Sequence, residues 1–130
     1  MFLDRMINQT NVPLLERVLD FTSARHTLIA ENMANLDTPG YVQKDLNADR
    51  FYGMLRERVE SAPPGGGTFE DVPADLTNPR AGILFHDGNN RSMEQLAADQ
   101  AKNALVHNLV VELLRKQYQQ LNMALSEKVS

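Results

Sequence analysis

Two long stretches of helically spaced apolar residues flank an irregular segment. The first stretch runs from about Asn11 to Leu36, with Asn11 as a suitable N-cap and Pro13 in the first turn. Its stripe recurs every three or four residues and comprises Leu15, Val18, Leu19, Thr22, Ile29, Met33 and Leu36. Three further apolar residues, Leu14, Phe21 and Leu28, are interpreted as widening the same stripe. This pattern predicts an amphipathic helix.

The first helix is expected to stop sharply before Pro39. A proline disfavours the α region for the residue before it, which here is Thr38. Pro39 and Gly40 fit the two central positions of a type II turn, where glycine supplies the positive φ. The chain is therefore predicted to change direction at this point.

The middle of the chain, residues 46–91, lacks the long helical periodicity of the two flanking stretches. A short helix is expected after Asn47 or Asp49, either of which is a suitable N-cap. Its apolar residues recur at every fourth position: Phe51, Leu55 and Val59. Residues 61–68 are rich in Pro and Gly and are predicted to form a flexible loop, and residues 83–85 fit one short strand. The whole segment is predicted to be irregular and loop-rich.

The second long helix is predicted from Ser92 to about Ser126. Ser92 and Gln95 form a capping-box pair, and no Gly or Pro follows them. One face of this helix carries Met93, Leu96, Val110, Val111, Leu114, Tyr118, Leu121 and Leu125. Gln100, Asn103 and His107 interrupt that face. Amides on a packing stripe fix register and partner choice, an interpretation favoured for Gln100 and Asn103 over solvated positions.

Helix lengths indicate how these elements associate. At ~1.5 Å per residue the two helices measure ~38 and ~52 Å, whereas a compact chain of this size has a radius of gyration of ~14 Å. We therefore expect a mainly α fold in which two long terminal helices form an antiparallel, coiled-coil-like hairpin around the loop-rich middle. Residues 1–45, 46–91 and 92–130 are expected to form one structural unit.

The longer stripe is expected to meet the first helix over part of its length and other molecules over the rest. The predicted assembly seam comprises Leu15, Leu19, Ile29, Met33, Leu96, Gln100, Asn103, Val110, Leu114, Tyr118, Leu121 and Leu125. Leu114 lies in the middle of the stripe and is expected to face a neighbouring chain rather than its own.

Composition argues against several functional classes. Acidic residues outnumber basic ones, 17 to 13, so the chain has no general electrostatic attraction to nucleic acid. It has no cysteine, which excludes thiolate metal sites and cysteine nucleophiles. His26, His86 and His107 have no metal-site spacing, and residues 65–67 lack the Lys and Ser/Thr of a phosphate loop. We expect no catalytic, cofactor or metal site, and no enzyme.

The N-terminal residues indicate how the chain reaches its compartment. They have no basic region followed by an apolar run, and no stretch is long and apolar enough to cross a bilayer. We therefore expect no cleaved signal peptide and no direct membrane insertion. Export from the cytoplasm would then need another apparatus.

Residues 29–41, Ile-Ala-Glu-Asn-Met-Ala-Asn-Leu-Asp-Thr-Pro-Gly-Tyr, resemble the signature of the bacterial flagellar axial proteins. That signature is an apolar residue, then Asn-x-Ala-Asn, two residues, and Thr-Pro-Gly-Tyr/Phe, at the end of an N-terminal helix. Its fixed positions are matched by Asn32, Ala34, Asn35, Thr38, Pro39, Gly40 and Tyr41. The resemblance extends over roughly residues 12–45 and 85–125. The short length and the absence of an Arg-Ala-Tyr-Glu-like run resemble the proximal rod members of that family.

The resemblance implies a structural subunit of the flagellar basal-body rod, a tubular drive shaft that crosses the periplasmic space and transmits motor torque. It implies assembly through the terminal helices, a requirement for flagellum assembly and motility, and export by the flagellar type III apparatus. The implied partners are other copies, other rod proteins, the basal-body base and the export apparatus, with no nucleic acid. Two alternatives stay open: another rod-family subunit, or a helical adaptor that binds a single partner.

Overall fold

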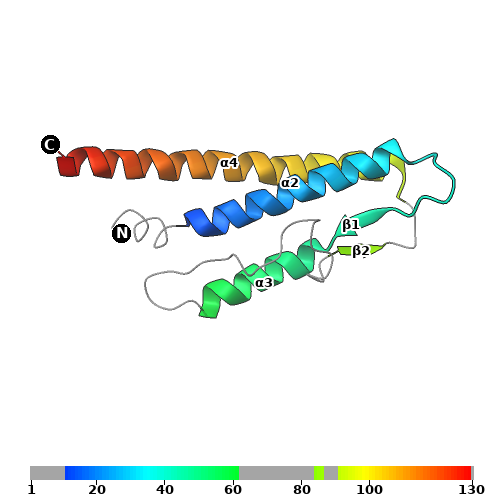
Figure 1. Cartoon of the computed structure of the whole chain (residues 1–130), viewed down its shortest axis with the longest axis horizontal. Coiled ribbons are helices and arrows are strands. Elements are labelled where there is room, and N and C mark those ends of the chain that lie inside the picture. Colours follow the sequence, from blue (N-terminus) through cyan, green and yellow to red (C-terminus); the bar gives the residue numbers. More distant parts are fainter. Residues whose placement is uncertain (1–10, 62–83, 87–90, 130) are drawn as a thin grey trace.

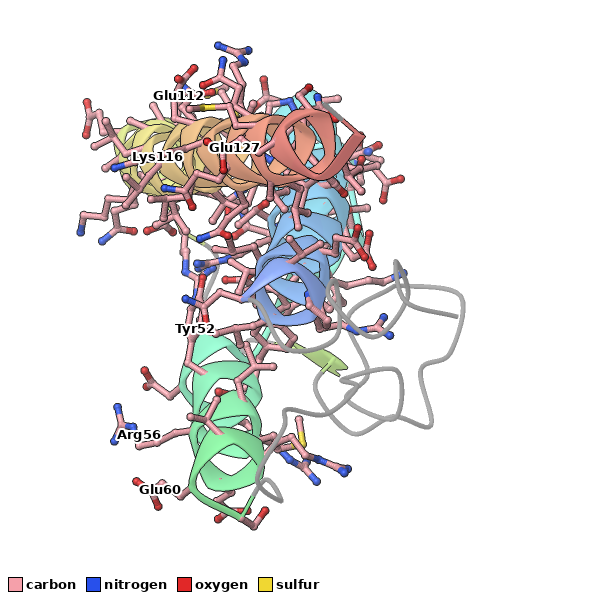
Figure 2. All side chains as sticks on the ribbon, turned by 90° about the vertical axis from the view of Figure 1, so that its left-hand side faces the viewer. Tyr52, Arg56, Glu60, Glu112, Lys116 and Glu127 are labelled. Atoms are coloured by element: carbon pink, nitrogen blue, oxygen red, sulfur yellow. The ribbon has the colours of Figure 1, made fainter. Side chains whose placement is uncertain are left out.

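The computed structural model describes residues 11–61, 84–86 and 91–129 of the chain. In chain order the elements are α2 (Val12–Ala34), β1 (Lys44–Leu46), α3 (Ala48–Ser61), β2 (Leu84–His86) and α4 (Met93–Val129). The two long helices α2 and α4 run antiparallel, and α2 lies between α4 and α3 (Figures 1 and 2). The predicted mainly α fold with a hairpin of two long helices is confirmed.

The helix starts follow the predicted signals. At α4, the Ser92 N–H donates to Gln95 Oε1 (3.1 Å) and the Gln95 N–H donates to Ser92 Oγ (3.2 Å), which confirms the capping box. At α3, the Arg50 N–H donates to Asn47 Oδ1 (3.0 Å), so Asn47 is the cap. Asn11 occupies the N-cap position of α2 but makes no capping bond with its side chain.

The middle segment is more regular, in its described part, than predicted. β1 and β2 pair antiparallel, with Lys44 opposite His86 and Leu46 opposite Leu84. The strand expected at 83–85 is present one residue later, whereas β1 was missed because three residues carry too little alternation to be recognised. The loop predicted at 61–68 lies outside the described residues except for Ser61, which ends α3.

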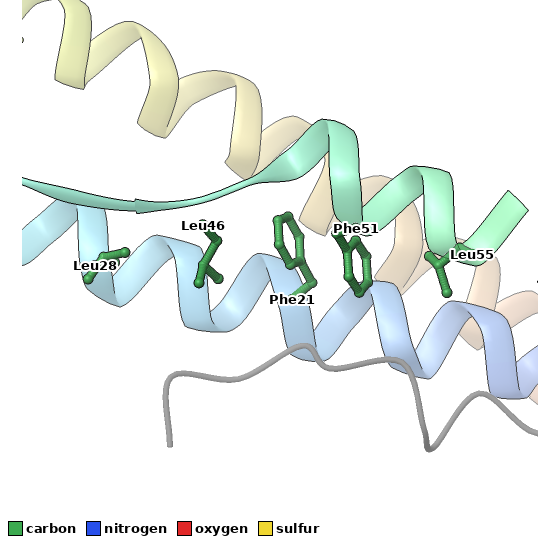
Figure 3. Packing of buried hydrophobic residues seen from close by; sticks show 5 residues of the cluster. All are labelled: Phe21, Leu28, Leu46, Phe51 and Leu55. Atoms are coloured by element: carbon green, nitrogen blue, oxygen red, sulfur yellow. The ribbon is translucent and has the colours of Figure 1, made fainter. Parts of the chain in front are cut away.

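A hydrophobic core joins α2 to β1 and α3. Its buried members are Phe21, Leu28, Leu46, Phe51 and Leu55 (Figure 3). The rings of Phe21 and Phe51 stack with centroids 4.0 Å apart, and Tyr52 packs edge-on against both. The interpretation of Leu14, Phe21 and Leu28 as a widening of one stripe is therefore wrong. They form a second apolar face of α2, because the middle segment folds back over that side of the helix.

A second cluster joins α2 to α4. Val12, Val110 and Leu114 are buried there, and Leu15, Val18 and Leu19 pack against them. α4 continues past the start of α2 (Figure 1). One helix, α2, thus separates two clusters and contributes to both.

A buried ion-pair network fastens the middle segment to both long helices. Asp45, with 2% of its side chain exposed, accepts bonds from Arg25 Nε and Nη2 and from Arg91 Nη1, each 2.9 Å long. Asp99 lies 3.7 Å from the same Arg91 nitrogen. Burial lowers the pKa of Arg25, but the hydrogen bonds and charge of Asp45 outweigh it and raise that pKa. This network could not be predicted from the sequence, because its residues are far apart in the chain.

Asp45→Asn is expected to destabilise the fold strongly, since it removes the buried carboxylate that pairs with two partly buried guanidinium groups and leaves Arg91 only Asp99 at 3.7 Å. A loss of ~3–5 kcal/mol in the free energy of unfolding is expected from breaking such a pair. The matched control is Asp20→Asn, whose surface pair with Arg17 spans 3.5 Å and whose loss costs less than ~1 kcal/mol. Urea unfolding followed by circular dichroism measures both. Equal losses in the two variants would contradict the role assigned to Asp45.

Candidate functional site

The turn after α2 has the geometry that the motif predicts. Gly40 has φ +76°, and the Tyr41 N–H donates to the Thr38 carbonyl (3.2 Å), as a type II turn requires. The end of α2 is closed just before it: Asn35 Nδ2 donates to the Glu31 carbonyl (2.9 Å), and Thr38 Oγ1 donates to Asn35 Oδ1 (3.2 Å). Two of the motif side chains therefore close the helix end, and the glycine reverses the chain.

Asn32 holds the reversed chain against α2. Its side chain is buried, and Nδ2 donates to the Lys44 carbonyl (2.6 Å) while Oδ1 accepts the Lys44 N–H (3.1 Å). Oδ1 also accepts the Tyr41 hydroxyl (3.1 Å). The side-chain amide thus bonds both backbone groups of one residue of β1, as a neighbouring strand would. Ala34 and Pro39, the other motif residues, are exposed.

Gln43, which directly precedes β1, makes the same kind of paired hydrogen bonds with the backbone of Arg91. Its Nε2 donates to the Arg91 carbonyl (2.9 Å) and its Oε1 accepts the Arg91 N–H (2.8 Å). The segment after the turn is thereby joined to the residues that lead into α4. The role of Gln43 could not be predicted, since a lone buried glutamine has no local signature in the sequence.

Polar side chains of α4 bond the backbone of α2. Asn103 Nδ2 donates to the Thr22 carbonyl (2.8 Å), and Gln100 Nε2 donates to the His26 carbonyl (3.2 Å). Thr22 Oγ1 donates to the Leu19 carbonyl, so its oxygen accepts from His107 Nδ1, 2.9 Å away. Gln100, Asn103 and His107 are therefore interfacial residues rather than purely solvated ones.

The structure brings most of the predicted seam together within one chain. Buried seam residues are Ile29, Leu96, Asn103, Val110, Leu114 and Leu121. Partly exposed ones are Leu15, Leu19, Met33, Gln100 and Leu125, and Tyr118 is exposed. A role for these positions between subunits stays a prediction.

The expectation that Leu114 faces a neighbouring chain is not met in this structure. The side chain is 7% exposed and packs in the cluster formed with Val12 and Val110. The reason is the antiparallel alignment, which lays the start of α2 along this turn of α4. Nearer the C-terminus, the Tyr118 hydroxyl donates to Glu16 (2.9 Å), and this bond together with partial burial raises the pKa of Tyr118.

A second apolar face of α4 was missed in the sequence. Leu105, Leu109 and Leu113 are 71, 59 and 41% exposed and lie four residues apart, so they share one side of the helix. We call these three residues the outer stripe. Glu112, which neighbours them on the helix surface, points away from α2 (Figure 2). The sequence does contain a signal for this face: apolar residues occur in adjacent pairs, such as Leu109–Val110 and Leu113–Leu114, and the two members of a pair lie on different sides of the helix.

A groove of about 430 Å³ lies beside the contact between α2 and α4. Its lining residues are Ser23, His26, Thr27, Asn103, Ala104, His107 and Asn108. We call this the side groove. The described part of the chain holds no cluster of three or more His, Asp or Glu residues suited to a metal ion. Among the same residues, no helix combines the length and the apolar character needed to cross a membrane.

These features define a helical-hairpin protein. Its two long helices run antiparallel and are connected by the middle segment, and the Thr-Pro-Gly turn that begins this segment is hydrogen-bonded back onto the first helix. No family model matches the chain. A curated protein, the flagellar basal body rod protein FlgB of Borrelia hermsii, is 24% identical over 132 residues, which cover 92% of this chain and 98% of that protein. The resemblance to flagellar rod proteins of the FlgB type, predicted from the motif, is confirmed.

Gly40→Val is expected to destabilise the fold through its backbone alone, because a Cβ at Gly40 would meet nothing within 4 Å. A β-branched residue at positive φ carries ~1–3 kcal/mol of strain. The control is Gly53→Ala in α3, where a Cβ also meets nothing and where alanine stabilises by ~0.5–1 kcal/mol. Thermal and urea unfolding compare the variants. If the Gly40→Val protein is as stable as the wild type, the fold does not depend on a glycine at this positive φ.

Leu114→Ala and Leu113→Ala form a matched pair, since adjacent leucines lie on different faces of α4. The buried Leu114 is expected to lose ~2–5 kcal/mol of stability on truncation, whereas the change at Leu113 stays within ~0.5 kcal/mol. Chemical unfolding of both purified variants measures the difference. If the two losses are equal, the assignment of the two faces is wrong.

Proposed function

We propose that this chain is a structural subunit of the bacterial flagellar basal-body rod, in its proximal part. The observation that carries the proposal is the similarity to FlgB of Borrelia hermsii over nearly the whole of both chains. The Thr-Pro-Gly turn supports it independently, because Asn32, Gly40 and Tyr41 each have a defined structural task there. The proposed role is structural, and no catalytic step is assigned to any residue.

The geometry suits a load-bearing subunit. α4, with 37 residues, is ~55 Å long. α2 packs against it through apolar contacts and accepts hydrogen bonds from the amides of Gln100 and Asn103. Two paired helices resist bending better than one. In the proposed rod they would pack side by side into a tube that transmits torque from the motor.

The proposal places the subunit in the rod within the periplasmic space. Its partners would be other copies, other rod proteins, the basal-body base and the flagellar type III export apparatus. Export would proceed without a cleaved signal peptide. Another rod-family subunit is a close alternative, and a helical adaptor with a single partner is a more distant one.

Deletion of the gene in the bacterium that carries it tests the proposal. We expect non-motile cells without external filaments, because a missing rod subunit stops all later assembly. Restoring the wild-type gene is the control and should return motility. Basal bodies purified from the restored strain should contain the chain in more than one copy.

Other results would contradict this function. Motile deletion cells, or basal bodies that lack the chain, would remove it from the rod. Recovery of the chain only in a closed complex with one partner would favour the adaptor.

A further inference from the structure

We propose that His26 and His107 together bind one divalent transition-metal ion, such as Zn²⁺ or Ni²⁺, in the side groove, with water molecules as the remaining ligands. Both histidines line this groove, His26 from α2 and His107 from α4. The two residues are far apart in the chain, so the local spacing that argued against a metal site could not show that they share one surface. The inference goes beyond the proposed function and does not depend on it.

The antiparallel pairing of α2 and α4 turns the two histidine side chains toward each other. Asn103 bonds the Thr22 carbonyl and Gln100 bonds the His26 carbonyl, so His26 and His107 lie on opposite sides of the level where Thr22 and Asn103 meet. Side chains on a helix lean toward the N-terminus of that helix. His26 therefore leans back toward the level of Thr22, and His107 leans back toward the level of Asn103. The two imidazoles enter the groove from opposite ends.

Thr22 holds the His107 ring in the form that a metal ion requires. The single hydroxyl hydrogen of Thr22 is donated to the Leu19 carbonyl (3.0 Å), so His107 Nδ1, which lies 2.9 Å from the same oxygen, donates its own hydrogen to it. The neutral ring then carries its lone pair on Nε2. Metal-binding histidines generally donate the other ring N–H to a protein oxygen, which fixes the ring and makes the ligating nitrogen more basic. Thr22 is thus a positioning residue for His107.

The chemistry of the groove selects the class of ion. Imidazole nitrogen suits zinc, nickel and copper, whereas magnesium and calcium prefer carboxylate and carbonyl oxygens. The described lining residues include no Asp or Glu that would favour these last two ions, and no Lys or Arg that would repel a cation. Two imidazoles are fewer than the three or four protein ligands of most zinc sites, so we expect weaker binding than at a structural zinc site. An ion held by both helices would stabilise their pairing in proportion to its occupancy.

Titration calorimetry of the full chain, prepared without a histidine tag, tests the inference with Zn²⁺, Ni²⁺ and Mg²⁺ at neutral pH. We expect one Zn²⁺ or Ni²⁺ ion per chain and no saturable binding of Mg²⁺. His26→Gln, at an exposed position, removes one ligand and should weaken binding by about tenfold or more, since even the loss of a supporting residue costs ~10- to 100-fold. Zn²⁺ should also raise the midpoint of thermal unfolding of the wild type, and not that of His26→Gln.

Two further variants separate a built site from general binding by histidine. Thr22→Val keeps both imidazoles and removes only the hydroxyl that orients His107, so it should weaken binding by ~10- to 100-fold. His86→Gln is the matched control, because His86 lies in β2 rather than on either long helix, and its affinity should equal that of the wild type. Circular dichroism checks that each variant keeps the helical content of the wild type.

Three results would overturn the inference. They are the absence of saturable binding to the wild type, wild-type affinity in His26→Gln, and an equal loss of affinity in His86→Gln. Wild-type affinity in Thr22→Val would overturn the positioning role of Thr22. The deletion strain tests the rod function separately, so the two proposals can fail independently.

Discussion

The structure depends on a single constraint: α2 must bury two opposite faces at once. One face meets α4 through Val12 and its neighbours, and the other meets α3 through the stacked pair Phe21 and Phe51. The chain can cover the second face only by reversing directly after α2. Gly40 makes that reversal possible, and the Asn32 amide then bonds both backbone groups of Lys44.

Buried polar groups, rather than a larger apolar core, give this small fold its defined geometry. The side chains of Asn32 and Gln43 each bond a backbone N–H and a backbone carbonyl, as a neighbouring strand would. Asp45 pairs with two arginines from distant parts of the chain. Buried groups of this kind are costly when any partner is missing, so they favour one arrangement over near alternatives. Most residues of the motif Asn-x-Ala-Asn…Thr-Pro-Gly-Tyr thus serve to hold β1 against α2.

The sequence was sufficient for features that depend on local spacing. Periodicity and caps placed α2, α3 and α4 to within a few residues, and the Pro39-Gly40 pair defined the turn. The sequence was not sufficient to predict contacts between residues that are distant in the chain. The Arg25–Asp45–Arg91 network and the β1–β2 pairing have no local signature. α4 posed a different difficulty, because apolar residues on both of its faces made the choice of the inner face ambiguous, and the outer stripe was overlooked.

We infer that α4 serves two interfaces, one within its own chain and, in the proposed rod, one between chains. A side-chain-resolution map of the assembled basal body from the bacterium that carries this protein tests it most directly. The account predicts that Leu114 packs against Val12 of the same copy, while Leu113 and Leu109 are covered by an adjacent copy. A map in which Leu109 and Leu113 remain exposed to solvent, or in which α2 and α4 of one copy are separated, would contradict it.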